Sequence, residues 1–130
     1  MSIPTTTFMR RLAVLCTLAL TVFGLSVASA SAGTHESIKT KRGSVAFNHK
    51  GEILTAEDSK GDGIGIMAHL FWKVKKNKTV SATVIDGSGA DGLPNAKNLD
   101  IRDGTVVNLK LCYTNNGVVF KCSKVQKATA

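Results

Sequence analysis

Apolar and polar residues alternate along most of the chain after residue 43, which is the pattern of strands buried on one face. The longest run covers residues 64–74 and places on one face Ile64, Ile66, Ala68, Leu70, Trp72 and Val74. Shorter runs lie near residues 45–47, 52–56, 79–84, 99–101, 106–113 and 118–125. Gly- and Asn-rich turns separate them. We therefore predict an all-β fold, a small antiparallel β-sandwich or barrel of about seven strands.

The first 32 residues have a different pattern, that of a secretory signal peptide. Arg10 and Arg11 precede an apolar stretch from Leu12 to about Val27, and small residues follow it. Two overlapping A-x-A sites place cleavage after Ala30 or after Ala32. The Arg pair leaves both general and twin-arginine export open. The apolar run is shorter than the roughly 20 residues of a membrane-spanning helix, so we expect no membrane span after cleavage.

Cleavage divides the chain into a signal peptide (1–32), a flexible basic arm (33–42) and a single β domain (43–130). A poorly packed first strand is the alternative for the arm. Cys16 should leave with the signal, so Cys112 and Cys122 are the two thiols that remain. A secreted protein meets oxidising conditions, and we expect these two to form a disulfide.

The disulfide conflicts with a second signal in the same hairpin. Asn116-Gly117 favours a two-residue type I′ turn, and such a turn pairs Leu111 with Cys122. Cys112 and Cys122 would then lie on opposite faces and could not bond. A β-bulge or an odd-length turn would bring them level, and we predict such an irregularity.

Composition and charge limit the classes of function that the protein can have. The chain has 130 residues and is 43% apolar but only 5% aromatic, which excludes a multidomain enzyme and a disordered acidic tail. Residues 33–130 carry fifteen Lys and Arg and nine Asp and Glu, a net charge of +6. This charge favours anionic partners such as wall polymers, acidic proteins or phospholipid headgroups, although charge for solubility alone is the other interpretation.

The lysines fall into two groups that are candidates for anion binding. The first group is predicted to lie at the tip of one hairpin and consists of Lys73, Lys75, Lys76 and Lys78. The second is predicted to line one face near the end of the chain and consists of Lys110, Lys121, Lys124 and Lys127. Nucleic acid fits poorly, because the chain is exported and Phe71 is the one aromatic side chain expected to point outward.

The segment 86–98 is predicted to be a long loop and is the first candidate for contact with a ligand or partner. Its candidate contact residues are Asp86, Asp91, Leu93 and Pro94. The loop fails the EF-hand pattern, because the fifth position is Ala90 and the twelfth is Lys97. His35, His49 and His69 lack metal-ligand spacing, and no catalytic motif stands out. We expect no enzyme activity, cofactor or metal site.

The C-terminal half resembles a known group. The stretches Asp86-Gly-Ser-Gly-Ala-Asp-Gly, Asp103-Gly-Thr-Val-Val-Asn-Leu and Leu111-Cys-Tyr-Thr-Asn-Asn-Gly look like small uncharacterised secreted β-rich proteins of actinobacteria, especially streptomycetes. The resemblance implies an extracellular β-rich domain with a Cys112–Cys122 bridge and implies no activity. A weaker resemblance is to the enediyne-binding apoproteins, whose second disulfide this chain lacks.

These observations together predict a secreted, non-enzymatic β-domain that binds an anionic component or a protein at the cell envelope. The alternative is an inhibitor of an extracellular hydrolase, such as a protease, that presents the loop 86–98, because such inhibitors present a rigid exposed loop.

Overall fold

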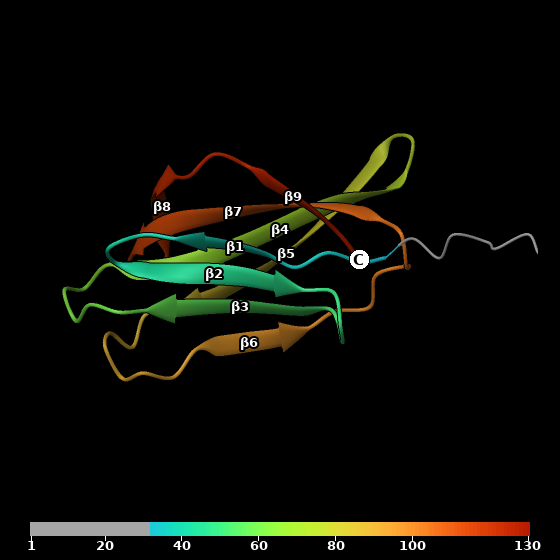
Figure 1. The fold of residues 1–130 in the computed structure, drawn as a ribbon. Coiled ribbons are helices and arrows are strands. Elements are labelled where there is room, and N and C mark those ends of the chain that lie inside the picture. The colour runs from blue at the N-terminus through green and yellow to red at the C-terminus, as the bar shows by residue number, and fades with distance from the viewer. Residues whose placement is uncertain (1–31) are drawn as a thin grey trace, which may run out of the picture.

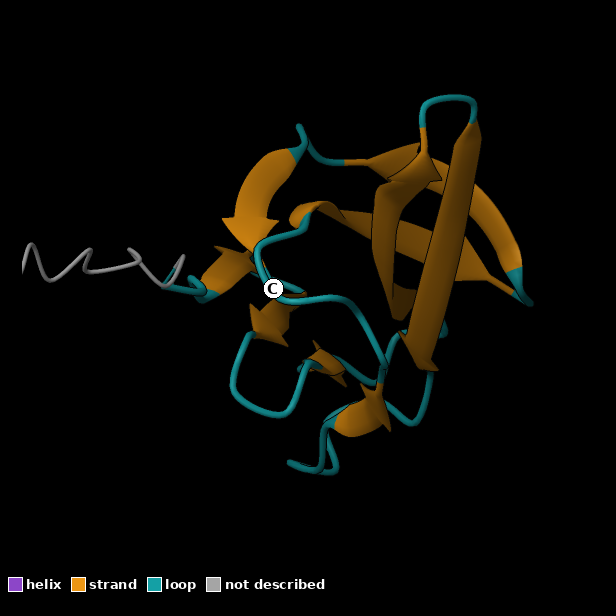
Figure 2. Cartoon of the chain, turned by 90° about the vertical axis from the view of Figure 1, so that its right-hand side faces the viewer, coloured by secondary structure: helices purple, strands orange, loops and turns teal. Residues whose placement is uncertain are grey.

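The computed structural model describes residues 32–130, which form two stacked antiparallel β-sheets (Figure 1). The predicted signal peptide lies, except for its last residue, outside the described residues. Strands and connecting loops account for the described chain (Figure 2). Within this range, no helix is long and apolar enough to cross a membrane. The prediction of an all-β fold is confirmed.

Nine strands make up the two sheets, where the alternation predicted about seven. Sheet A has the order β1-β2-β3-β6 and consists of β1 (Glu36–Lys39), β2 (Gly43–Asn48), β3 (Ile53–Asp58) and β6 (Asn95–Asn98). Sheet B has the order β5-β4-β7-β8, with β9 also paired to β7, and consists of β4 (Gly65–Lys75), β5 (Lys78–Asp86), β7 (Val106–Asn115), β8 (Val118–Cys122) and β9 (Gln126–Thr129).

One core fills the space between the sheets. Phe47 and Leu54 enter it from sheet A, and Leu70, Leu109 and Leu111 enter it from sheet B, each at most 2% exposed. The predicted inner stripe is half-buried at Ile64, just before β4, buried from Ile66 to Leu70, partly covered at Trp72 and exposed at Val74. The β4–β5 hairpin therefore projects beyond the core, as its yellow-green tip shows in Figure 1.

Residues 36–39, which the sequence placed in a flexible arm, form strand β1 and pair with β2. The flexible-arm prediction is wrong for this segment, and the alternative of a poorly packed first strand describes it. Ile38 faces Val45 across the pair and packs on the core, but every residue of β1 keeps some exposure. Such an edge strand buries few apolar side chains, which explains its weak signal.

Two other strand boundaries differ from the alternation. The strand expected at 99–101 lies at Asn95–Asn98, where the side chains are exposed on both faces and backbone pairing with β3 alone defines the strand. Leu99 and Ile101 follow it and pack on the core without being a strand. The final predicted run 118–125 is a strand only as far as Cys122, and β9 lies beyond the run and was not predicted; Ser123 follows the end of β8. Its hydroxyl accepts a hydrogen bond from the Leu111 N–H at 3.0 Å, in place of a backbone carbonyl.

The β7–β8 hairpin resolves the conflict between its turn and its cysteines. Asn116 and Gly117 both have positive φ, at 48° and 79°, as a type I′ turn requires. Val119 faces Thr114 beyond the turn, and a bulge then follows, so that Lys121 faces Tyr113. The extra residue brings Cys112 opposite Cys122, and the disulfide forms. The predicted irregularity is confirmed.

The same hairpin leaves strand β8 with little cover. All five of its residues are exposed, and Val118 and Phe120 are 67% and 56% exposed. Tyr113 and Phe120 approach each other with ring centroids 6.1 Å apart. Since β8 is an edge of sheet B, the disulfide to the buried Cys112 is the strongest link between this strand and the rest of the molecule.

We predict that the double substitution Cys112→Ala and Cys122→Ala lowers the free energy of unfolding by about 3 kcal/mol, because the unfolded chain regains the freedom of a ten-residue loop. Urea denaturation followed by Trp72 fluorescence measures the change. The wild-type protein in the presence of a reductant should show the same shift. An unchanged urea midpoint in both would contradict a stabilising role for the bridge.

Candidate functional site

The outward side of sheet B carries a group of cations around one aromatic ring. The β4–β7 and β7–β9 registers align Phe71 with Asn108 and Asn108 with Lys127, so Phe71 and Lys127 share a face. Lys73 lies two residues from Phe71, and Lys110 lies two residues from Asn108, on that same face. We call the surface formed by Lys73, Lys110 and Lys127 around Phe71 the basic face.

Contacts within the basic face hold the ring and a cation together. The Nζ atom of Lys110 lies 5.9 Å from the centroid of the Phe71 ring, within cation–π range. The His69 and Phe71 ring centroids are 5.5 Å apart. Beside them, an open depression of about 390 Å³ is lined by Lys73, Thr105, Val106, Asn108 and Lys127. Two ammonium groups, those of Lys73 and Lys127, therefore border a hollow on the outward side of sheet B.

The predicted hairpin lysines adjoin the basic face. Lys73 belongs to that face, while Lys75, Lys76 and Lys78 are exposed around the turn between β4 and β5. A register shift between Lys73 and Lys75 interrupts the pairing just before the turn. The structure thus brings the first predicted lysine group together on one hairpin and joins it to Lys110 and Lys127.

The second predicted lysine group does not share a single face. Lys110 and Lys127 belong to the basic face, but the bulge in β8 places Lys121 opposite Tyr113, on the inward side of the hairpin. Lys121 there borders a depression of about 200 Å³ with Thr40, Leu111, Tyr113, Cys122 and Ser123. The sequence could not separate these lysines, because the exact position of the bulge decides their side.

Charge is strongly segregated between the two sheets. Residues 65–86 and 106–129, which include all of sheet B, hold eight lysines and one acid, Asp86. Asp86 is fully buried, so sheet B, all of which is described, exposes no carboxylate. The other eight acids of the described chain lie in sheet A or in loops, where Asp62 forms an ion pair with Arg42. The positive potential of the protein is therefore concentrated on sheet B.

The environment of His69 reflects this segregation. His69 faces the uncharged Thr83 of β5 on one side and Lys110 of β7 on the other. Partial burial, and secondarily the nearby positive charge of Lys110, lower the pKa of His69 below its ordinary value of 6.5. His69 is therefore neutral near pH 7, when no anion lies on the basic face.

The predicted contact loop 86–98 is shorter than expected, because β5 extends to Asp86 and β6 begins at Asn95. The connecting segment is residues 87–94. The assignment of Asp86 to a contact surface is wrong: its carboxylate accepts hydrogen bonds from the backbone N–H groups of Asp58, at 2.8 Å, and Ser88, at 3.1 Å. Asp86 thus links the end of β5 to the end of β3 across the two sheets.

The remaining residues of that loop are accessible. Asp91, Leu93 and Pro94 are all exposed, and Leu93 reaches 69%. The Leu93 N–H donates to the Asp91 carboxylate at 2.8 Å, which fixes the backbone just before Leu93. The Asn95 side-chain amide donates to the carbonyl of Ile85 at 2.7 Å and closes the base of the loop. Leu93 is thus presented on a loop with internal hydrogen bonds.

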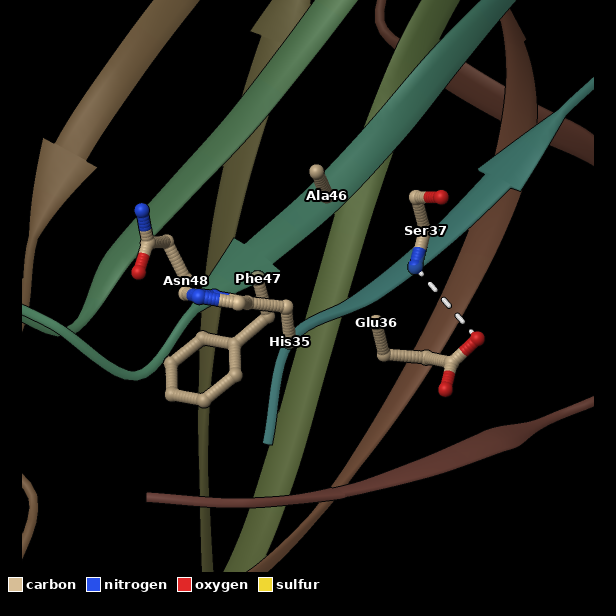
Figure 3. A pocket seen from close by; sticks show the side chains of 6 residues that line it. All are labelled: His35, Glu36, Ser37, Ala46, Phe47 and Asn48. Atoms are coloured by element: carbon tan, nitrogen blue, oxygen red, sulfur yellow. Dashed lines mark hydrogen bonds between the residues drawn. The ribbon is translucent and has the colours of Figure 1, made fainter. Parts of the chain in front are cut away.

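A further depression of about 370 Å³ lies at the edge of sheet A, between β1 and β2 (Figure 3). It is lined by His35, Glu36, Ser37, Ala46, Phe47 and Asn48. The Glu36 carboxylate is engaged by the backbone N–H of Ser37 at 3.4 Å. No group of three His, Cys, Asp or Glu side chains in residues 32–130 is arranged to hold a metal ion.

Comparison with known proteins adds no assignment: no protein-family model, curated protein or solved structure matches the chain. The resemblance to small secreted actinobacterial proteins stays a prediction, and the function is inferred from the geometry above.

The lowered pKa of His69 predicts a pH-dependent stability. Protonation of His69 is less favourable in the folded chain than in the unfolded chain. Its stabilising contribution is thus complete above about pH 6.5 and is lost as the pH falls toward the folded pKa. Between pH 7 and pH 5.5 the wild type should lose more stability than His69→Gln, as measured by urea denaturation. Equal losses in the two proteins would contradict the prediction, and an NMR titration of the imidazole reads the pKa directly.

Proposed function

We propose that this protein is a secreted, non-enzymatic binding protein that attaches to an anionic polymer of the cell envelope through the basic face and the adjoining hairpin lysines. The single observation that carries the proposal is that residues 65–86 and 106–129, which include all of sheet B, hold eight lysines and expose no acidic side chain. A charged surface that served solubility alone would have no need for this separation, since mixed signs keep a protein soluble equally well.

The shape of the basic face supports a polymer rather than a compact ligand. Lys110 lies opposite His69, which is four residues from Lys73 along β4, so the basic face is about 14 Å long. Its width from β4 across β7 to β9 is two interstrand spacings, or about 10 Å. Phe71 lies within this area and holds Lys110 by a cation–π contact. An open area of this size can contact several charged repeats of a polymer at once.

The oxidised state of the protein supports the location. The Cys112–Cys122 disulfide is typical of an oxidising, extracellular environment. Export directed by a signal peptide, which is then removed, is the route that the first 32 residues predict. A small protein carrying one cationic surface outside the cell would meet the anionic polymers of the envelope directly.

A second candidate function is the inhibition of an extracellular hydrolase, and the geometry of Leu93 favours it. Leu93 is highly exposed on a loop braced by Asp91 and Asn95, as an inhibitor that presents a fixed apolar side chain requires. Inhibition of a secreted protease that is lost in Leu93→Ala, and kept when the basic face is neutralised, would replace the polymer proposal with this one.

We predict that the triple substitution of Lys73, Lys110 and Lys127 to Gln weakens binding to immobilised long-chain polyphosphate and to isolated bacterial cell walls. The logarithm of the binding constant should depend less steeply on the logarithm of the salt concentration, by about 2 in slope for three lost contacts. Binding isotherms at four salt concentrations, from low to physiological, measure the slope.

The matched control is the triple substitution of Lys39, Lys50 and Lys97 to Gln, which gives the same net charge but changes sheet A and its β2–β3 turn. This control should bind nearly as the wild type does. Equal weakening in both triple variants would show that net charge alone governs retention and would overturn the proposal. Tighter binding to DNA than to polyphosphate or cell walls would overturn the choice of polymer.

A further inference from the structure

The three residues that precede β1 have a composition suited to metal binding at a chain terminus. Cleavage after Ala32, one of the two predicted sites, would make Gly33, Thr34 and His35 the first three residues of the mature chain. Histidine would then occupy the third position, with a free amine two residues before it. A metal site here rests on the secretion part of the proposed function and is independent of polymer binding.

This arrangement supplies four nitrogen donors in one plane. They are the Gly33 amine, the backbone nitrogens of Thr34 and His35, and the His35 imidazole, which close consecutive chelate rings around one ion. Neither Thr34 nor His35 is a proline, so each backbone nitrogen has a proton to lose. A tetragonal, nitrogen-rich site is the geometry that Cu(II) and Ni(II) prefer. Since three of the four donors are main-chain nitrogens, the site needs no cluster of side-chain ligands.

In the folded chain, the first and third residues of this tripeptide both contact the side chain of His49. The His35 and His49 ring centroids are 4.5 Å apart, and the His49 ring lies so close to Gly33 that a Cβ atom there would be 2.5 Å from it. His49 belongs to the turn between β2 and β3. Gly33 and His35 are two residues apart on one side of the segment, and both rest on His49.

The site is accessible, and a neighbouring donor is unused. His35 is exposed and lies over the end of β2 beside Asn48 (Figure 3). The Nδ1 atom of His49 is buried and has no hydrogen-bond partner among the described residues. A buried ring nitrogen without a partner is uncommon in folded proteins. Here it lies next to the two residues that would supply the amine and the imidazole.

One existing interaction competes with metal binding. The Thr34 N–H donates to the Thr129 carbonyl at 2.9 Å, and this bond is lost when the Thr34 nitrogen is deprotonated. The reciprocal bond, from the Thr129 N–H to the Thr34 hydroxyl at 2.9 Å, does not involve the ligating nitrogen and can remain. The segment thus stays attached to β9 while its backbone nitrogens turn to the ion.

We propose that the mature chain beginning at Gly33 binds one Cu(II) or Ni(II) ion through the Gly33 amine, the Thr34 and His35 backbone nitrogens and the His35 imidazole, with His49 positioning the segment. Binding releases the two amide protons, and it releases a third from the amine below its ordinary pKa of about 7.7–8.0. The ion changes no oxidation state in this step.

The experiment begins with the secreted protein. The whole 130-residue chain is expressed in an exporting host, and the N-terminus of the protein in the medium is sequenced. Titration with Cu(II), followed by visible absorption and circular dichroism, should show one equivalent bound with the spectrum of four nitrogen donors. A pH-stat should record the released protons. A protein that begins at Ser31, or that binds no Cu(II) stoichiometrically, would overturn the proposal.

Two variants isolate the site without disturbing the strands. The first variant is a chain that begins at Ala32. Its additional residue moves His35 to the fourth position, which should abolish the four-nitrogen spectrum. His35→Ala should weaken Cu(II) binding by more than the roughly 10–100-fold that removal of an outer-shell partner costs. Retention of wild-type affinity and spectrum in either variant would show that the ion binds elsewhere.

His49→Ala tests the positioning role, because it removes the ring on which Gly33 and His35 rest. The four-nitrogen spectrum should persist, with an affinity roughly tenfold lower. An unchanged affinity would overturn the part assigned to His49. Zn(II), which prefers tetrahedral sites, should compete poorly with Cu(II), and binding to polyphosphate should be the same in all these variants.

Discussion

The antiparallel pairing of β4 with β7 is the constraint on which both the core and the basic face depend. Leu70 faces Leu109 in this register, and the pair points into the core, while Phe71 and Asn108 face outward beside it. Side chains alternate strictly between the two faces of a strand. A slip of one residue would expose the buried leucines and turn Lys73 and Lys110 inward. Burial of the leucines therefore also keeps the lysines on the surface.

The β7–β8 hairpin shows how two incompatible local preferences are satisfied together. The Asn116-Gly117 turn fixes the pairing of its nearest neighbours, and the bulge then shifts the strand by one residue. This shift allows the disulfide, and it also turns Lys121 away from the basic face. A single inserted residue thus sets both a covalent link and the composition of a surface.

Much of this architecture could be predicted from the sequence, and the failures share a physical cause. Alternation identified strands with one buried face, such as β4 and β7, because burial imposes a period of two on their residues. It missed β6 and misjudged β1, whose exposed positions accept any residue. It also missed β9, in which Ala128 is the one buried residue, so that no alternation shows.

The candidate sites show the same contrast: those formed by neighbours in the sequence could be predicted, and those assembled by the fold could not. The hairpin lysines are adjacent in sequence and were found directly, whereas their union with Lys110 and Lys127 depends on strand order, which alternation does not determine. Asp86 looked like a loop residue because it precedes Gly87, yet it is a buried acceptor for the backbone of β3. His35 and His49 are fourteen positions apart and are brought together only by the fold.

The separation of charge between the sheets gives the molecule a permanent electric dipole directed from sheet A toward sheet B. Near an anionic surface the resulting torque turns sheet B toward that surface before contact, although screening confines the effect to about 8 Å at physiological salt. Because the sheets lie back to back, the outward side of sheet A then faces the medium. Arrival by diffusion would thus produce a layer of molecules that share one orientation.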